Sequence, residues 1–188
     1  MDYKILSILR SVYNHTNSGV SYAETKNAVL IGFNVALLGM AASLGKGAKG
    51  PLLIVLIVFI VLLSAAAGIS LFSFWPFTGQ DNNMKVTDDS VISDTEKESA
   101  VNENLLFYGA AAGKRPVDYI QCLYYRYKAN DKIKPSEMDS LTVDYAREIV
   151  YNGRIAMRKY NFFKYALLVE ACAGGAGVCL LILMLVLG

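Results

Sequence analysis

Three long stretches that carry almost no charge constrain this chain more than any other feature. Residues 27–45 and 51–79 contain no Asp, Glu, Lys or Arg, and residues 165–188 contain only Glu170. A helix of about 20 apolar residues crosses a hydrocarbon core about 30 Å thick, and each stretch is long enough to do so. The runs are continuous rather than alternating, which excludes a porin-like barrel. With 54% hydrophobic and 18% charged residues, the composition also excludes a soluble globular enzyme.

The sequence therefore predicts an all-α membrane protein with three transmembrane helices and a small cytosolic helical domain between the second and third. A turn with three glycines, closed by Pro51, separates the first two spans. We divide the chain into an amphipathic N-terminal segment (1–20), a first span (21–45), a second span (51–77), a polar acidic linker (78–103), a cytosolic helical sensor region (104–164) and a third span (165–188).

The segments outside the spans have distinct patterns. The apolar residues of segment 1–20 recur at helical spacing, which favours a short helix that lies either on the membrane or on the protein's own soluble part. The linker is predicted to be mobile, with a short strand around residues 85–87. Pro116 opens one helix of the sensor region, and Ser136–Asp139 has the spacing of a capping box that opens another. No helix breaker follows, so one long helix is expected to continue into the third span.

The distribution of basic residues predicts the topology. Three spans place the N-terminus and residues 77–164 on the same side, and these regions hold all Lys and Arg residues except Lys46 and Lys49. Lysine and arginine near the spans favour the cytoplasmic side. The N-terminus and residues 77–164 are therefore expected in the cytoplasm.

Several kinds of chemistry are not expected from this chain. His15 is the only histidine, so a histidine-based metal cluster cannot form within one chain, and a Ser-His-Asp triad is not expected. We expect no disulfide among the three cysteines, no metal and no cofactor. No nucleophile–base pair is visible, so an enzyme is not predicted. The net charge of +2 gives no general attraction to nucleic acid.

A few residues in or near the spans are candidates for gating or helix pairing. Glu170 lies inside the third span, where an ionisable group is a functional hypothesis by default, and Lys26 lies at a similar depth at the entrance of the first span. These two could form a contact, although Glu170 could also extend to the interface or pair structurally. Asn34 is either a pore-lining group or an interhelical hydrogen-bond partner. Gly175 belongs to a run of small residues that allows close helix contact, within one chain or between copies of a homo-oligomer.

A stripe of arginines in the sensor region is the candidate ligand site. Arg147, Tyr151, Arg154 and Arg158 are spaced 4, 3 and 4 residues apart, on one face of the predicted long helix. Arginines beside an aromatic ring can hold a phosphate and stack on a base. Such a stripe is also compatible with a solvated face whose arginines pair with neighbouring acids.

Three sequence segments together resemble the transmembrane Pycsar effector family, which is the membrane arm of a bacterial anti-phage system. The first is Tyr-Ala-Glu-Thr-Lys-Asn-Ala at residues 22–28, which leads into a span, and the second is Asn-Leu-Leu-Phe-Tyr-Gly at residues 104–109, followed by a helix. The third comprises residues 146–149 and 154–160, which lead into an apolar segment.

The resemblance implies a non-enzymatic effector in the bacterial inner membrane. A partner cyclase would make cyclic CMP or cyclic UMP on infection, and the effector would then impair membrane integrity and cause abortive infection. On this interpretation Arg147, Arg154 and Arg158 would bind the phosphate, and Tyr108 or Tyr151 would stack on the base. The alternative is a structural or adaptor membrane subunit whose cytosolic helices dock a protein partner.

Overall fold

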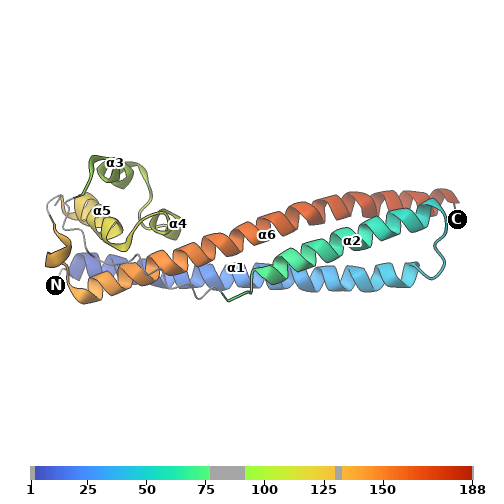
Figure 1. The fold of residues 1–188 in the computed structure, drawn as a ribbon, viewed down its shortest axis with the longest axis horizontal. Coiled ribbons are helices and arrows are strands. Elements are labelled where there is room, and N and C mark those ends of the chain that lie inside the picture. The colour runs from blue at the N-terminus through green and yellow to red at the C-terminus, as the bar shows by residue number, and fades with distance from the viewer. Residues whose placement is uncertain (1–2, 77–91, 130–132, 188) are drawn as a thin grey trace. The chain divides into compact units, whose positions relative to one another are not determined.

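The computed structural model describes residues 3–76, 92–129 and 133–187. All regular structure in these residues is helical, and three of the helices are long and apolar enough to cross a membrane, as predicted (Figure 1). The elements are α1 (Tyr3–Leu44), α2 (Pro51–Phe72), α3 (Asp94–Asn102), α4 (Tyr108–Ala112), α5 (Pro116–Lys128), a 3-10 turn η1 (Pro135–Glu137) and α6 (Ser140–Leu187).

The chain divides into two compact units. Unit 1 comprises Met1–Ser21 and Phe77–Met157, and unit 2 comprises Tyr22–Pro76 and Arg158–Gly188. The first halves of α1 and α6 therefore belong to unit 1 and their second halves to unit 2. The short helices α3, α4 and α5 belong to unit 1, whereas α2 belongs to unit 2.

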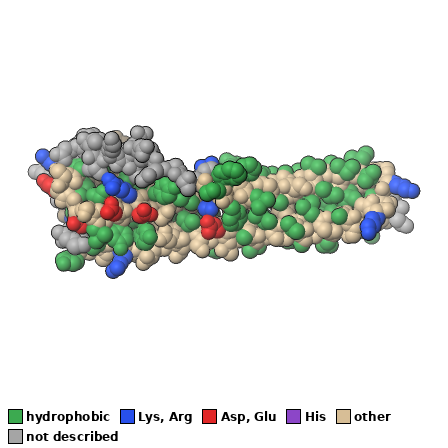
Figure 2. Space-filling model, turned by 60° about the horizontal axis from the view of Figure 1, so that its bottom comes forward, with side chains coloured by type: hydrophobic (Ala, Val, Ile, Leu, Met, Phe, Trp, Pro, Cys, Tyr) green, Lys and Arg blue, Asp and Glu red, His purple; other side chains and the backbone are tan. Residues whose placement is uncertain are grey.

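Unit 2 consists of the apolar parts of the three long helices. The buried residues recur every three, four or seven positions, and many are small, as expected where helices pack closely in lipid. On the outside, large apolar residues such as Val29, Ile54 and Leu181 are more than half exposed, and hydrophobic side chains cover much of the face in Figure 2. Ala41, Leu56 and Leu180 form an apolar cluster with residues of all three helices. Gly50 has a left-handed φ of 59° and Pro51 opens α2, which explains the turn before that helix.

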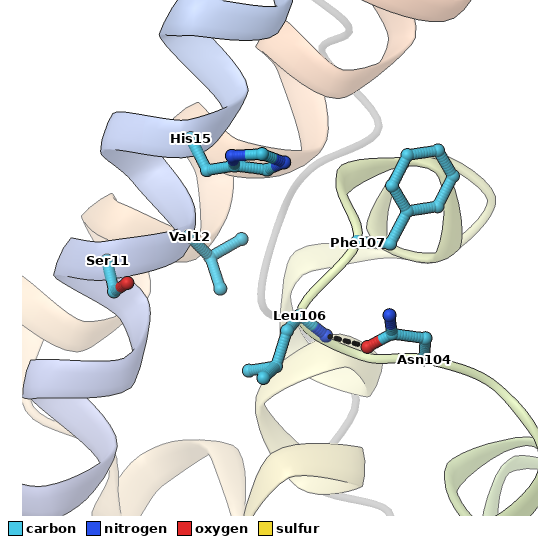
Figure 3. Close-up of a pocket in the computed structure, with 6 residues that line it drawn as sticks. All are labelled: Ser11, Val12, His15, Asn104, Leu106 and Phe107. Atoms are coloured by element: carbon cyan, nitrogen blue, oxygen red, sulfur yellow. Dashed lines mark hydrogen bonds between the residues drawn. The ribbon is translucent and has the colours of Figure 1, made fainter.

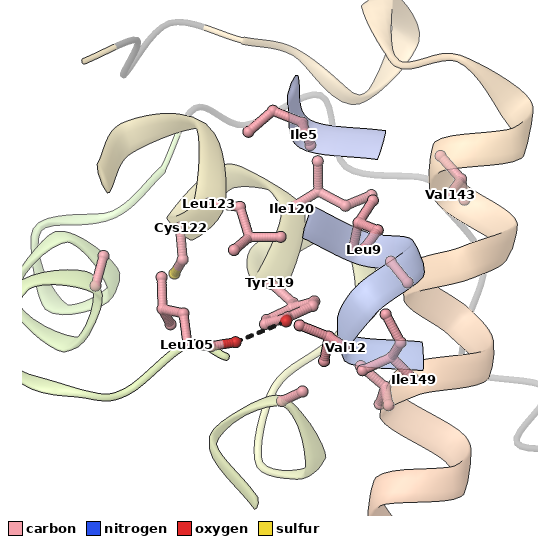
Figure 4. Close-up of a cluster of buried hydrophobic side chains, with 14 of the residues drawn as sticks. Ile5, Leu9, Val12, Leu105, Tyr119, Ile120, Cys122, Leu123, Val143 and Ile149 are labelled. Atoms are coloured by element: carbon pink, nitrogen blue, oxygen red, sulfur yellow. Dashed lines mark hydrogen bonds between the residues drawn. The ribbon is translucent and has the colours of Figure 1, made fainter. Parts of the chain in front are cut away.

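Unit 1 has a hydrophobic core of its own, to which distant parts of the chain contribute (Figure 4). Ile5, Leu9 and Val12 come from α1, Tyr119 and Leu123 from α5, and further residues from α3 and α6. The buried Tyr119 hydroxyl donates a hydrogen bond of 2.7 Å to the carbonyl oxygen of Leu105. Residues 3–20 of this segment thus pack against the protein's own helices, and they are the beginning of the 42-residue helix α1 rather than a separate element.

Two details of the sequence interpretation are corrected by the structure. The last part of the expected linker forms helix α3. The Ser93 side chain accepts a hydrogen bond from the Glu96 backbone, and the Glu96 side chain accepts one from the Ser93 backbone, which together make a capping box at the start of the helix. The helix also contacts α5, where Arg126 donates to the carbonyl of Ala100. The expected strand at 85–87 lies outside the described residues. Ser136 does not open the next helix as expected, because Pro135 starts a 3-10 turn there and α6 begins only at Ser140. From that point α6 continues without a break, as predicted.

Candidate functional site

An open pocket of about 350 Å³ lies in unit 1 (Figure 3). One wall is a face of α1, and the other is the loop between α3 and α4. The lining residues are Ser11, Val12, His15, Asn104, Leu106 and Phe107. The pocket combines two rings, an amide and a hydroxyl with apolar side chains, a mixture typical of small-molecule sites.

The local sequence explains how the loop wall is held. The Asn104 side-chain oxygen accepts from the backbone of Leu106 at 3.1 Å, and the Asn104 carbonyl accepts from Phe107 at 3.0 Å. This is a turn that an Asn side chain stabilises. Between these residues, the Leu105 carbonyl accepts the bond from Tyr119, which fixes the loop to the core. The Asn104 amide nitrogen points away from the turn in Figure 3, and it remains a donor group for a ligand.

Tyr108 lies next to the pocket but is itself buried, with 6% of its surface exposed. Its ring centre is 4.6 Å from that of Phe107 and 6.1 Å from that of His15. Two glycines allow this position. A Cβ atom at Gly19 of α1 would lie 2.8 Å from the Tyr108 ring, and one at Gly153 of α6 would lie 2.8 Å from its carbonyl oxygen. Tyr108 therefore links the pocket residues of α1 with α6.

Arg154 is close to the same short helix. Its Nε donates to the Ala112 carbonyl at 3.0 Å, and its NH2 group donates to the Lys114 carbonyl at 3.2 Å. These carbonyls lie at and just beyond the end of α4, where a helix leaves acceptors without intrahelical partners. The structure thus brings two of the sequence-predicted residues, Tyr108 and Arg154, to the two ends of α4.

The other predicted ligand residues are placed differently. Arg147 forms an ion pair with Asp144 at 3.4 Å, while its Nε is buried and has no hydrogen-bond partner among the described residues. Tyr151 is half-buried on α6. Arg158 belongs to unit 2, where its guanidinium lies 5.8 Å from the ring centre of Phe162.

Ionisable groups of unit 1 respond to their surroundings. Lys114 forms a 2.9 Å ion pair with Glu103 and also bonds to Ser99, and the hydrogen bond from Lys114 lowers the pKa of the Glu103 carboxyl. Burial raises the pKa of the Tyr119 hydroxyl and raises that of the Cys122 thiol to about 11. Both groups therefore stay neutral at physiological pH and act as core residues.

The charged residues near the entrance of the first span pair differently from the sequence interpretation. Glu24 forms a 3.0 Å ion pair with Lys159, which also donates to the Ser73 carbonyl at 2.9 Å. The Lys26 ammonium lies over three aromatic rings, those of Tyr22, Tyr160 and Phe163. Lys159, which was not among the residues selected from the sequence, is thus the charged partner of Glu24.

Glu170 lacks the suggested partner. One of its carboxylate oxygens, Oε2, is buried and has no hydrogen-bond partner among the described residues. The structure therefore does not bring Lys26 and Glu170 together. Asn34 is fully buried, and its Nδ2 donates to the Leu30 carbonyl at 3.0 Å.

The small residues of the third span face two directions. A Cβ atom at Gly177 would lie 3.3 Å from the ring of Phe59 in α2, so this glycine serves packing within unit 2. A Cβ atom at Gly175 would meet nothing within 4 Å, and this residue is exposed. Gly175 therefore makes no close helix contact within the described chain.

None of the six pocket residues was selected as a ligand-binding residue from the sequence: Ser11, Val12, His15, Asn104, Leu106 and Phe107. Three of these, Asn104, Leu106 and Phe107, are in the segment 104–109 that carries the family resemblance, so that segment marked one wall of the pocket. The α1 wall could not be recognised, because Ser11 and His15 resemble an ordinary solvated helix face. Among the described residues, no group of three His, Cys, Asp or Glu could hold a metal ion.

Comparisons with known proteins identify the family. Neither the curated proteins nor the solved structures give a significant match. The family model of the Pycsar effector protein domain matches residues 8–188, which is nearly the whole chain and includes both walls of the pocket and all three long helices. The chain therefore belongs to the Pycsar effector family, the membrane effectors of a bacterial anti-phage defence system.

Proposed function

We propose that this effector is activated by a cyclic pyrimidine nucleotide, cyclic CMP or cyclic UMP, which a partner cyclase makes on infection. Activation impairs the integrity of the inner membrane and stops growth of the infected cell before phage is released. The family match supports the signal and its source. The observation that carries the proposal is the pocket of unit 1, because it offers a ring-lined site of suitable size.

The pocket suits a single pyrimidine base. Its volume of about 350 Å³ is at the lower end of the range of small-molecule sites, which extends from about 300 to 1,000 Å³. The rings of Phe107 and His15 supply stacking surfaces, and aromatic stacking on a base contributes about 1–3 kcal/mol. The Asn104 amide and the Ser11 hydroxyl supply hydrogen-bonding groups for the polar edge of the base.

Arg154 is our candidate for the cyclic phosphate. Its guanidinium donates to two neutral carbonyl oxygens. A phosphate is a stronger acceptor, because charge-assisted bonds are roughly twice as strong as neutral ones and a guanidinium can bind phosphate through two parallel bonds. Nucleotide binding would thus release the end of α4 from Arg154. Arg147 and Arg158 remain further phosphate candidates on the same helix, and Tyr151 remains a stacking candidate.

The effect of the nucleotide reaches the membrane through chain connectivity. Ser11 and His15 are on α1 and Arg154 is on α6, and both helices continue into unit 2. A ligand that prefers one arrangement of these helices shifts the population toward that arrangement. Full switching from 1:99 to 99:1 needs about 5.5 kcal/mol of differential affinity. A homo-oligomer that binds one nucleotide per subunit can supply that energy through several sites.

Binding measurements on the purified full chain test the proposal. Isothermal titration with cyclic CMP and cyclic UMP should show binding of one or both. Phe107→Ala and Arg154→Ala should each weaken that binding by about tenfold or more, equivalent to roughly 1.4 kcal/mol. Arg154→Lys should also weaken it, because lysine lacks the planar fork. Lys97→Ala, at a surface ion pair with Asp94, is the matched control and should bind as the wild type does.

Two results would count against the proposal. If both Phe107→Ala and Arg154→Ala bound the nucleotide with wild-type affinity, the assignment of the site would be wrong. If the wild type bound neither nucleotide, activation by these nucleotides would be contradicted, and an adaptor that docks a protein partner would be favoured. Entry of a membrane-impermeant dye into cells, with and without the partner cyclase, tests the membrane step in the same way.

A further inference from the structure

Unit 2 contains five buried oxygen atoms that have no hydrogen-bond partner among the described residues. They belong to Asn27 and Asn34 of α1, to Ser70 of α2, to Ser73 directly after it, and to Glu170 of α6. Asn27, Asn34 and Ser70 are fully buried, and Ser73 is 1% exposed. Leaving a buried polar atom unpaired costs about 1–3 kcal/mol. Five in one small helical unit therefore need a functional reason.

The orientation of the two amides follows from their donors. In Asn27 the Nδ2 group donates to the Ala23 carbonyl at 2.9 Å and to the Lys159 carbonyl at 3.2 Å. In Asn34 it donates to the Leu30 carbonyl at 3.0 Å. Because a carbonyl can only accept, the nitrogen must face it and the amide oxygen must face elsewhere. Both Asn residues thus present an acceptor to the interior.

The positions of these atoms along the helices follow from the contacts of Lys159. Its own carbonyl accepts from Asn27, so Asn27 and Lys159 share one level, and its side chain extends to the Ser73 carbonyl near that level. With a helical rise of 1.5 Å per residue, Asn34 is about 10 Å further along α1 and Glu170 about 16 Å further along α6. Ser70, three residues before Ser73, is about 4.5 Å from that level. The oxygens thus extend over about half of a 30 Å hydrocarbon core.

Apolar side chains such as Leu30, Ala66 and Ala166 are buried between these oxygens, and beyond Glu170 the buried residues are apolar alone. They are Ala173 and then the cluster of Ala41, Leu56 and Leu180. An apolar constriction of this kind closes a path by excluding water. At the other end, the Glu24–Lys159 ion pair stands at the level where the oxygens begin.

We infer that these oxygens line a path for small monovalent cations, hydronium included, which enters from the Lys159 level and is closed at the apolar cluster. This inference rests on the proposed function, because it states how an activated effector impairs the membrane. Amide, hydroxyl and carboxyl oxygens are the ligands that hard cations and their water take up. Glu170 supplies an acidic side chain where the apolar half begins, and acidic side chains are what cation channels use to select cations over anions. Separation of the helices at the cluster lets water through and completes the path.

Flux from proteoliposomes tests the path. Vesicles that hold the full chain, potassium ions and a pH-sensitive dye are exposed to cyclic CMP or cyclic UMP. The wild type should release potassium or protons. In Asn34→Leu and in Glu170→Gln the flux should be about tenfold lower, which corresponds to an increase of roughly 1.4 kcal/mol in the free-energy barrier to ion passage. Val35→Leu is the matched control, because Val35 is adjacent to Asn34 but is 59% exposed on the outer face. Equal flux in Asn34→Leu, Glu170→Gln and the wild type would overturn the inference.

A second measurement separates this inference from the proposed function. If the wild type shows no flux with either nucleotide, the proposal that a nucleotide triggers membrane damage is contradicted. The access of water to the path can still be measured in that case. In a chain with its three cysteines replaced by alanine, Asn34→Cys should react with a charged, membrane-impermeant thiol reagent in open membrane fragments. Val35→Cys should not react, because it faces lipid. Equal and negligible reaction at both positions would overturn the path, whatever the nucleotide does.

Discussion

Tyr119 and Cys122 show how burial decides the role of a reactive side chain in this protein. Both are fully buried on α5, and both have a pKa raised above its ordinary value by burial. Sequence alone identified Cys122 only as a cysteine outside the spans. The partner of Tyr119, the carbonyl of Leu105, could not be predicted because the two residues meet only in the folded core.

The first prediction concerns the reactivity of the Cys122 thiol. Alkylation requires the thiolate, and the pKa of about 11 keeps nearly all of the thiol protonated at pH 8. In a variant whose Cys172 and Cys179 are replaced by alanine, iodoacetamide should therefore modify the folded protein at least about tenfold more slowly than the unfolded chain. Mass spectrometry of the alkylated protein measures this, and equal rates would show that the thiol is accessible.

The same pKa has a consequence for stability at alkaline pH. The folded-state pKa lies above the ordinary value of 9.0, so burial favours the neutral thiol. Its stabilisation is complete below about pH 9 and is lost as the pH rises toward about 11. Cys122→Ala should therefore show a smaller fall in unfolding temperature between pH 8 and pH 10 than the chain with the native cysteine. An identical fall would mean that other groups set the alkaline limit.

Single residues of the candidate sites were predictable only in part. Glu170 was identified because an ionisable residue inside an apolar run is visible in the sequence. The sequence could not show that its Oε2 has no hydrogen-bond partner among the described residues, since a contact with Lys26 stayed open until the structure placed that ammonium over aromatic rings. Arg154 was identified from its spacing on α6, but its bonds to two carbonyls of a distant segment depend on tertiary packing.

At the level of the helices, close packing depends on a few glycines. Gly153 of α6 allows the Tyr108 carbonyl to approach, because a Cβ atom there would be 2.8 Å from that oxygen. Backbone atoms cannot move away as a flexible side chain can. The long helices and the turn before Pro51 were predictable because length, hydropathy and breakers are local properties. The start of α6 was not, because Pro135 and η1 displaced the expected cap.

The second prediction tests the contact of α6 with α4. Gly153→Ala should lower the free energy of unfolding of unit 1 by about 1–3 kcal/mol, the usual cost of overpacking a tight contact. Thermal unfolding of the detergent-solubilised protein measures the loss. Gly113→Ala is the control, because it has an ordinary φ of −79° and an added Cβ there meets nothing within 4 Å. Similar melting temperatures for both variants would contradict the proposed role of Gly153.

On the scale of the whole molecule, the two compact units share two helices. Each unit takes residues from α1 and α6, so neither corresponds to one continuous piece of sequence. The division at residues 20 and 165 that we expected from hydropathy follows the polar–apolar boundary. The absence of a helix breaker predicted that α6 continues across this boundary, but the change in hydropathy near residue 20 hid the same continuity in α1.

The third prediction concerns orientation in the membrane. The distribution of Lys and Arg predicts that residues 77–164 are cytoplasmic and that the loop with Lys46 and Lys49 faces outward. In a cysteine-free background, Lys46→Cys should react with a membrane-impermeant thiol reagent added to intact spheroplasts. Glu98→Cys should react only after permeabilisation. The opposite pattern would place the pocket outside the cell, where a nucleotide made in the cytoplasm could not reach it.

The core of unit 1 also has a consequence for biosynthesis. It needs residues 3–21 at the beginning of the chain and residues 140–157 near its end, on either side of the first two spans. During synthesis, the apolar side chains of Ile5 and Leu9 therefore stay without their α6 packing partners until a segment some 130 residues later has been made. A nascent or prematurely terminated chain thus cannot assemble the core of unit 1.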